Sequence, residues 1–159
     1  MKRTVFSGLI FLLILTGLFA ITACSKDDDT AKEQAKKDEQ IIKDYLAENE
    51  IDAQRHESGM YYLITKEGTG DQPTSTSRVE VFYKGYLTNG NVFDETTQGS
   101  VIFNLQGLIE AWKIGIPLLK EGGSGTFFVP SALGYGSSAV GSIPANSVLI
   151  FEIDLVAVL

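Results

Sequence analysis

The sequence is poor in the residues on which most catalytic and metal-binding sites depend. Its 159 residues include one cysteine and one histidine. One cysteine excludes an intrachain disulfide framework and a thiolate metal cluster, and one histidine excludes a zinc site built from several histidines. The histidine, His56, lies in a polar stretch, which argues against a nucleophile activated by an imidazole base. We therefore expect neither a metal ion nor a cofactor.

Basic residues are also scarce. Lysine and arginine together number 13 against 20 aspartate and glutamate residues, and the formal net charge is −7. A nucleic-acid-binding protein would carry a basic face, so we expect no nucleic acid as partner. No glycine-rich loop ends in Lys-Ser or Lys-Thr before a helix, which excludes a phosphate-binding loop. The adjacent Asp94 and Glu95 are interpreted as a solvated loop, although spacing alone leaves paired-carboxylate hydrolysis open.

The N-terminal segment is hydrophobic over a length that suits export. A short basic start precedes an uncharged run over residues 5–21, and an acidic stretch follows at residues 25–29. This layout is typical of a signal peptide, and an uncleaved transmembrane anchor is the alternative. The residues Ile21-Thr22-Ala23-Cys24 resemble a bacterial lipobox. We therefore expect cleavage after residue 23 and lipid attachment at Cys24.

A lipid on Cys24 implies that the mature chain is attached to a membrane. Several acyl chains on one residue hold a protein firmly, whereas a single chain binds only marginally. Ser25 resembles the sorting signal that directs lipoproteins of Gram-negative bacteria to the outer membrane. The acidic run after it resembles the export signals of Bacteroidetes surface lipoproteins, with a solvated linker as the alternative. We expect a lipid-anchored protein of the Gram-negative cell envelope, at the outer membrane and facing the periplasm or the cell surface.

Residues 30–49 are predicted to form a helix. Thr30 and Glu33 fit a capping box, and Ile42 and Leu46 share one helical face. Because this apolar stripe is thin, we interpret the helix as a solvated spacer with one weakly packed face, and a dimerisation or docking helix is the alternative. The three expected segments are a lipoprotein signal peptide (1–23), a polar linker with the spacer helix (24–59) and a folded domain (60–159).

From residue 60 onward the sequence indicates β-strands. Strand-forming runs end at turn sequences, of which Asn89-Gly90 is a strong hairpin signal. A short helix is expected near residues 108–115, where Leu108, Ile109 and Trp112 share one face. The fold class is therefore α+β, an antiparallel sheet of about five strands with one short helix packed across it. The expected strands occupy residues 60–65, 78–87, 101–103, 124–129 and 148–158.

Aromatic residues lie near turns and strand ends, where they suit the lining of a pocket. A pocket of this kind with few polar groups fits a small apolar ligand. It also suits rotation about an amide bond, a reaction that needs no nucleophile, metal or cofactor. The alternative is that these residues only form core, which we expect for Phe103 and for one of Phe127 and Phe128. The aromatic positions are Tyr83, Phe93, Phe103, Trp112, Phe127, Phe128, Tyr135 and Phe151.

Several blocks of the sequence resemble FKBP-type peptidyl-prolyl isomerases, in order and close to the spacing of that family. The resemblance covers roughly residues 60–159 and implies the family fold, a twisted antiparallel sheet wrapped around a short helix. It also implies peptidyl-prolyl cis-trans isomerase activity on proline-containing polypeptides. The blocks are Val81-Phe82-Tyr83-Lys84-Gly85, Asn89-Gly90, Val92-Phe93-Asp94, Leu108-Ile109-Glu110-Ala111-Trp112, Glu121-Gly122-Gly123, Phe128-Val129-Pro130-Ser131, Leu133-Gly134-Tyr135-Gly136, Ile143-Pro144-Ala145-Asn146-Ser147 and Leu149-Ile150-Phe151-Glu152-Ile153.

The resemblance implies an apolar catalytic pocket. Trp112 would form its floor, and Tyr83, Phe93 and Phe151 would form walls around the proline ring of the substrate. Leu108 would lie at the edge and contact the bound peptide.

The resemblance also implies polar groups at the rim of the pocket. The backbone N–H of Ile109 and the hydroxyl of Tyr135 would donate hydrogen bonds to substrate carbonyls, and Asp94 would orient the wall. Val101 stands at a substrate-binding wall position that is often aromatic in the family, and no arginine lies between Asp94 and Ser100. Macrolide inhibitors are implied as ligands, and we expect these departures to reduce macrolide affinity more than activity.

Two functions agree with these observations. The first is an isomerase that assists the folding of exported proteins. The barrier of about 18–20 kcal/mol to X-Pro rotation reflects amide resonance, and an apolar pocket favours the twisted amide because it separates less charge. The alternative is an FKBP-like module that binds proline-bearing peptides or a partner surface with little catalysis. An intact pocket favours the enzyme.

Overall fold

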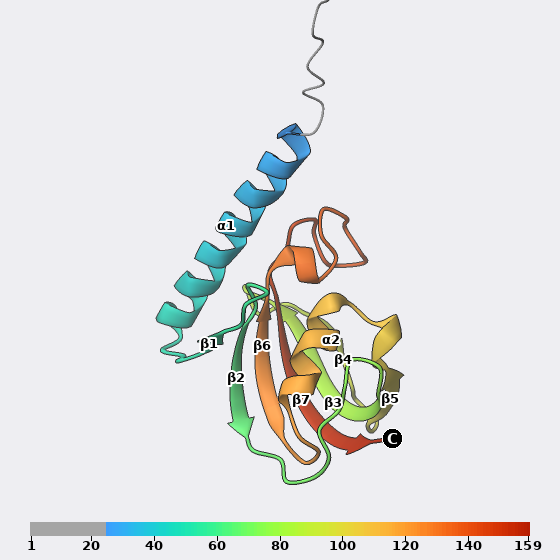
Figure 1. Cartoon of the computed structure of the whole chain (residues 1–159). Helices are drawn as coiled ribbons and strands as arrows, with labels where there is room; N and C mark the ends of the chain where they lie inside the picture. The colour runs from blue at the N-terminus through green and yellow to red at the C-terminus, as the bar shows by residue number, and fades with distance from the viewer. Residues whose placement is uncertain (1–24) are drawn as a thin grey trace, which may run out of the picture.

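The computed structural model describes residues 25–159, so the expected signal peptide and Cys24 lie outside the described residues. A long N-terminal helix lies beside a curved sheet that holds a second, short helix (Figure 1). Within the described chain, no helix is both long and apolar enough to cross a membrane. The elements are α1 (Ser25–Glu48), β1 (Gln54–Arg55), β2 (Tyr61–Lys66), β3 (Arg78–Leu87), β4 (Val92–Glu95), β5 (Val101–Asn104), η1 (Leu105–Gly107), α2 (Glu110–Gly115), η2 (Ile116–Leu118), β6 (Ser124–Val129), η3 (Ser131–Leu133) and β7 (Leu149–Val158).

One antiparallel sheet of seven strands forms the body of the domain. Its strands lie in the order β1-β2-β6-β7-β3-β4, and β5 pairs with β3 beside this path. The central strands β3 and β7 each have ten residues and pair from Val79 opposite Val158 to Leu87 opposite Leu149. The sheet wraps around α2, which confirms the predicted fold class. The short strands β1 and β4 are additional to the strands expected from the sequence.

The hairpin between β3 and β4 turns where the sequence predicted it. Gly90 has a φ of 85°, a backbone conformation that glycine adopts without steric cost. Its N–H donates to the carbonyl of Leu87 at 2.8 Å and closes the turn. The resulting register places Gly85 of β3 opposite Asp94 of β4.

The concave face of the sheet and α2 enclose the main core. Alternate residues of β3 and β7 point into it, because successive side chains of a strand face opposite sides. Val79, Val81 and Leu155 are at most 1% exposed. Helix α2 begins at Glu110, two residues later than expected, because Ile109 is extended at φ −60° and ψ 154° and precedes the first turn.

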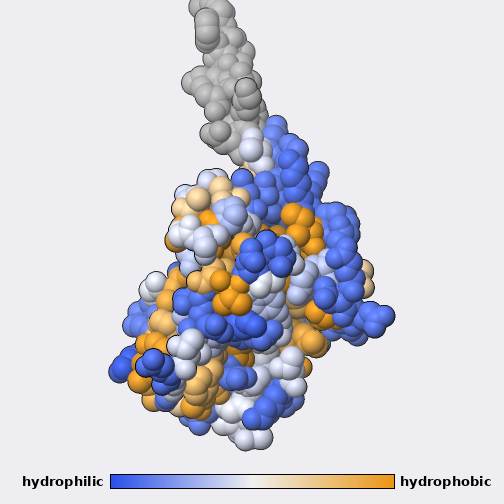
Figure 2. All heavy atoms as spheres, turned by 180° about the vertical axis from the view of Figure 1, so that it is seen from behind, coloured by the Kyte–Doolittle hydropathy of each residue, from blue (hydrophilic) through white to orange (hydrophobic). Residues whose placement is uncertain are grey.

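Helix α1 packs on the convex face of the sheet, and the packed face of the expected spacer is more firmly buried than the sequence predicted. Ile42 and Leu46 meet Phe128 and Ile150 in a second buried cluster. The helix also begins at Ser25, which places Thr30 inside it and not at its N-cap. The reason is that a thin apolar stripe suffices when the sheet offers apolar side chains opposite it. The outward side of the helix remains hydrophilic (Figure 2).

An ion-pair network joins the same helix to the segment before β2. Glu39 pairs with Lys43 at 3.0 Å and with Arg55 of β1 at 3.1 Å. The hydrogen bonds from Lys43 and Arg55 lower the pKa of Glu39 from 4.5 to about 2. The polar residues after α1 therefore include one short strand that helps to hold the helix in place.

Candidate active site

The predicted pocket residues, apart from Val101, gather in one cavity between α2 and the sheet. Its volume is about 170 Å³. We call it the aromatic cavity, and its lining comes from β3, β4, β5, the two residues between η1 and α2, α2, β7 and the flap, defined as residues 131–146. The lining residues are Tyr83, Phe93, Asp94, Phe103, Leu108, Ile109, Trp112, Tyr135 and Phe151.

Trp112 forms the floor of the aromatic cavity. Its side chain is 6% exposed and contacts three rings edge to face. The centroid distances are 5.2 Å to Tyr83, 5.5 Å to Phe103 and 5.7 Å to Phe151. Edge-to-face packing suits the opposite charges of ring edges and faces, so these contacts hold the rings upright around the floor.

The wall formed by Phe93 depends on a glycine in the neighbouring strand. Phe93 packs edge to face against Phe151 at 5.6 Å between centroids. A Cβ on Gly85 would lie 2.5 Å from the Phe93 ring and 2.9 Å from the Phe151 ring. Only a residue without a side chain therefore lets both rings close over β3.

The sequence predicted Val101 at the wall of the cavity, but Val101 does not line it and Phe103 lies there instead. Both residues belong to β5, at the edge of the sheet. Val101 is the first residue of the strand, is 39% exposed, and does not line the cavity. The larger Phe103 reaches Tyr83 and Trp112. Its size and its position two residues along the same strand face were the available signals for this role.

One hydrogen bond orders the polar side of the cavity. The Tyr83 hydroxyl donates to Oδ2 of Asp94 at 2.7 Å. Burial, the larger cause, and this hydrogen bond, the next, raise the pKa of Tyr83 above its usual 10.0. The phenol therefore stays neutral. Asp94 thereby orients one wall of the cavity and keeps its other oxygen for further contacts.

Two further donors lie at the rim. Ile109 is the N-cap of α2, and its N–H meets no acceptor among the described residues. A helix leaves its first N–H groups without internal partners, which makes this position suited to a ligand carbonyl. Tyr135 stands on the flap and is 37% exposed. The aromatic cavity therefore combines apolar walls with donors at its mouth.

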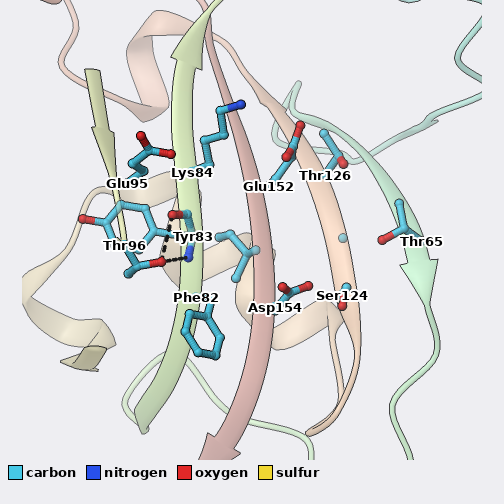
Figure 3. A pocket seen from close by; sticks show the side chains of 12 residues that line it. Thr65, Phe82, Tyr83, Lys84, Glu95, Thr96, Ser124, Thr126, Glu152 and Asp154 are labelled. Carbon is cyan, nitrogen blue, oxygen red and sulfur yellow. Dashed lines mark hydrogen bonds between the residues drawn. The ribbon is translucent and has the colours of Figure 1, made fainter. Parts of the chain in front are cut away.

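A larger hollow lies on the convex face of the sheet, beyond the end of α1. Its volume is about 500 Å³, and mostly polar or charged side chains stand along it (Figure 3). Thr96 donates to the carbonyl of Tyr83 and accepts from its N–H, which ties the loop after β4 to β3. Phe82, 42% exposed, is the apolar ring on this face. This hollow has no enclosing aromatic walls, unlike the aromatic cavity.

His56 lies away from the aromatic cavity. Its Nδ1 is hydrogen-bonded to Ser58 in the turn before β2. Among the described residues, no group of histidine, cysteine, aspartate and glutamate side chains could hold a metal ion.

Comparison with known proteins agrees with this geometry. Residues 70–156 match the family of FKBP-type peptidyl-prolyl cis-trans isomerases. The FKBP-type peptidyl-prolyl cis-trans isomerase FkpA of Aeromonas hydrophila is 40% identical over 142 residues, which are 87% of this chain and 51% of that protein. A probable FkpA of Neisseria meningitidis serogroup B is 39% identical over 139 residues, which are 86% of this chain and 50% of that protein. The chain spans about half the length of these curated relatives.

Two crystal structures share the fold. A peptidyl-prolyl cis-trans isomerase from Pseudomonas syringae pv. tomato has a TM-score of 0.70 at 29% identity, covering 80% of this chain and 94% of that one. FkpA from Escherichia coli has a TM-score of 0.70 at 30% identity, covering 82% of this chain and 63% of that one.

Proposed function

The chain belongs to the FKBP-type peptidyl-prolyl cis-trans isomerase family, and on this premise we propose that it catalyses rotation about X-Pro bonds in exported polypeptides. The observation that carries the proposal is the aromatic cavity with Trp112 as its floor. Its volume of about 170 Å³ is well below the roughly 300–1,000 Å³ typical of drug-sized ligand sites, which suits a single proline ring.

The chemistry follows from the apolar walls. A planar amide separates charge by resonance, and rotation about its C–N bond removes that resonance. Aromatic rings solvate the planar amide less well than water does, so the twisted form becomes relatively more favourable. This selective stabilisation lowers the barrier without a nucleophile. A reduction of about 6–8 kcal/mol corresponds to an acceleration of roughly 10⁴- to 10⁶-fold.

The donors at the rim orient the peptide. The N–H of Ile109 donates to a backbone carbonyl of the substrate, and the Tyr135 hydroxyl donates to the carbonyl beside the rotating bond. Asp94 holds the Tyr83 ring at the wall. Each of these groups fixes one part of the peptide while the proline ring lies against Trp112.

A refolding assay limited by proline isomerisation tests this function. The soluble chain 25–159 should accelerate refolding of a proline-limited protein, and Phe93→Ala should lose most of that acceleration while remaining folded by circular dichroism. Equal rates with and without the folded wild-type chain would overturn the proposal. Peptide binding without acceleration would identify a binding module in its place.

We propose further that the mature chain is held at a Gram-negative cell envelope through lipidated Cys24, at the outer membrane. The support is the lipobox-like sequence that ends an uncharged run. We also propose that macrolide inhibitors bind in the aromatic cavity, with affinity reduced because no arginine lies between Asp94 and Ser100. Titration with a macrolide, followed by fluorescence of the single tryptophan at the cavity floor, measures that affinity.

A further inference from the structure

A buried carboxylate joins α1 to the flap. Asp38 is fully buried on the side of α1 that faces the domain. Its Oδ2 accepts from the N–H of Ser131 at 2.8 Å and from the Ser131 hydroxyl at 2.6 Å. Its Oδ1 accepts from Nε2 of Gln34 at 2.7 Å. Two hydrogen bonds from Ser131 to one buried side chain make this a firm link between distant parts of the chain.

Ser131 in turn fixes the backbone on both sides of Tyr135. Its carbonyl accepts from the N–H of Gly134 at 3.0 Å and from the N–H of Gly136 at 2.8 Å. The carbonyl of Gly136 accepts from the N–H of Asn146 at 2.8 Å, which closes the far end of the flap. The position of Tyr135 therefore depends on Ser131, which Asp38 holds from the helix.

On one side of this link, α1 and the flap do not pack against each other. Beside it, α1 and the flap are separated by a hollow of about 370 Å³, lined in part by Ala31, Ala35 and Gly136. Small side chains leave that space open. Without the carboxylate, the N–H of Ser131 would lose its partner in a buried position, a loss that favours displacement of the flap.

We propose that Asp38 is a positioning residue that acts through Ser131 to hold Tyr135 at the mouth of the aromatic cavity. This inference rests on the proposed isomerase function for its kinetic consequence. Helix α1 then belongs to the working enzyme, although none of its residues lines the aromatic cavity.

The chain offers a matched control on the same helix. Asp44 accepts from Nε2 of Gln40 at 2.8 Å, with the same spacing of four residues as Gln34 and Asp38. Asp44 lies on the exposed side. Asp44→Ala therefore removes a similar carboxylate and a similar helical hydrogen bond without touching the flap.

A double-mutant cycle separates positioning from general stability. Asp38→Ala should lower kcat/KM about three- to tenfold, and Asp44→Ala should change it less than about twofold. Tyr135→Phe should lower kcat/KM in the wild type but have little further effect in the Asp38→Ala background, because the hydroxyl is already displaced. If Asp38→Ala only reduced the amount of folded protein, Tyr135→Phe would lower kcat/KM by the same factor in both backgrounds. An unchanged effect of Tyr135→Phe would therefore overturn the proposal.

Amide hydrogen exchange tests the link without any activity. Asp38→Ala should accelerate exchange at Gly134 and Gly136 at least about tenfold, while the β3–β7 amides and the Asp44→Ala protein stay unchanged. Equal acceleration in the sheet, or none in the flap, would contradict a positioning role. Should Asp38→Ala fail to fold, Ser131→Ala removes only the hydroxyl and should show the same pattern with a smaller change. Accelerated flap exchange in a chain without isomerase activity would leave the link standing and remove the proposed function.

Discussion

The hydroxyl of Tyr83 donates a 2.7 Å hydrogen bond to Oδ2 of Asp94, across the pair of strands that forms one wall of the aromatic cavity. The bond places the only carboxylate of the cavity lining against a ring that also packs on Trp112. The Tyr83 side chain therefore contacts both the Asp94 carboxylate and the apolar floor formed by Trp112. This arrangement orients the wall and occupies one oxygen of the carboxylate.

The raised pKa of Tyr83 predicts how kcat/KM and the stability of the fold depend on pH. Amide rotation needs no general acid or base, and the raised pKa keeps the phenol neutral, so kcat/KM should stay nearly constant from about pH 6 to 8. Because the folded state holds this proton more tightly than the unfolded chain, the associated stability is present below about pH 10 and is lost as the pH rises further. Urea unfolding at several pH values should show this loss, and Tyr83→Phe should reduce it. A bell-shaped rate profile centred near neutrality would contradict the mechanism.

Phe93 and Val101 should respond differently to truncation. Phe93→Ala removes a wall of the aromatic cavity and should lower kcat/KM at least about tenfold, or roughly 1.4 kcal/mol in transition-state binding. It should also cost stability, but less than the roughly 3–5 kcal/mol typical of a fully buried ring, because Phe93 is only partly buried. Val101→Ala is the control and should leave kcat/KM within about twofold. Steady-state kinetics on the folded variants measures kcat/KM for both. Equal losses of kcat/KM in the two variants would mean that the substrate does not bind in the aromatic cavity.

Gly85 should tolerate no side chain. Gly85→Ala would bring Cβ within 2.5 Å of the Phe93 ring and should destabilise the protein by about 1–3 kcal/mol while weakening peptide binding. Gly107 has open space around it and is the matched control, so Gly107→Ala should change stability by less than about 0.5 kcal/mol. Denaturant unfolding compares the two. A neutral Gly85→Ala variant would show that the rings can move apart freely.

Two neighbouring isoleucines test whether α1 is part of the folded unit. Ile42 is fully buried against the sheet, whereas Ile41 is 41% exposed. Ile42→Ala should cost about 2–5 kcal/mol of unfolding free energy, and Ile41→Ala should cost less than about 0.5 kcal/mol. Equal, small effects in chemical denaturation would mean that the helix is a solvated spacer after all.

Cys24 carries the prediction of membrane attachment. Cys24→Ala should leave the chain unprocessed or release it from the membrane fraction, because no acyl chains can then be attached. Fractionation of cells followed by intact-mass measurement distinguishes the processed, lipidated form from the full-length chain. The same mass and the same membrane retention in both proteins would contradict lipidation.

Local pattern was sufficient for much of the sheet and for most of the candidate site. The bounds of β3 and β6 match the predicted runs, and Asn89-Gly90 turns the hairpin as expected. These features depend on residues adjacent in sequence, where alternation and turn conformation act directly. The family resemblance then brought Trp112, Phe93 and Phe151 to one cavity, where the structure also places them.

What failed depended on contacts between distant segments. Asp38 lies four residues before Ile42 and eight before Leu46, so its alignment with the apolar stripe was a signal of burial that the thinness of the stripe obscured. Its partner, Ser131, is 93 residues away, and no local pattern joins them.

The amino-acid sequence alone therefore determined the strands, the turns and the apolar character of the cavity, because these follow from local conformational preference and side-chain chemistry. Tertiary structure decided that α1 packs on the sheet, that Phe103 and not Val101 lines the cavity, and that a buried carboxylate holds the flap. Each of these depends on which surfaces meet once the chain has folded. Whether a side chain is buried, and whether its hydrogen bonds are made, depends on both segments that come into contact. The sequence of one segment alone does not predict it.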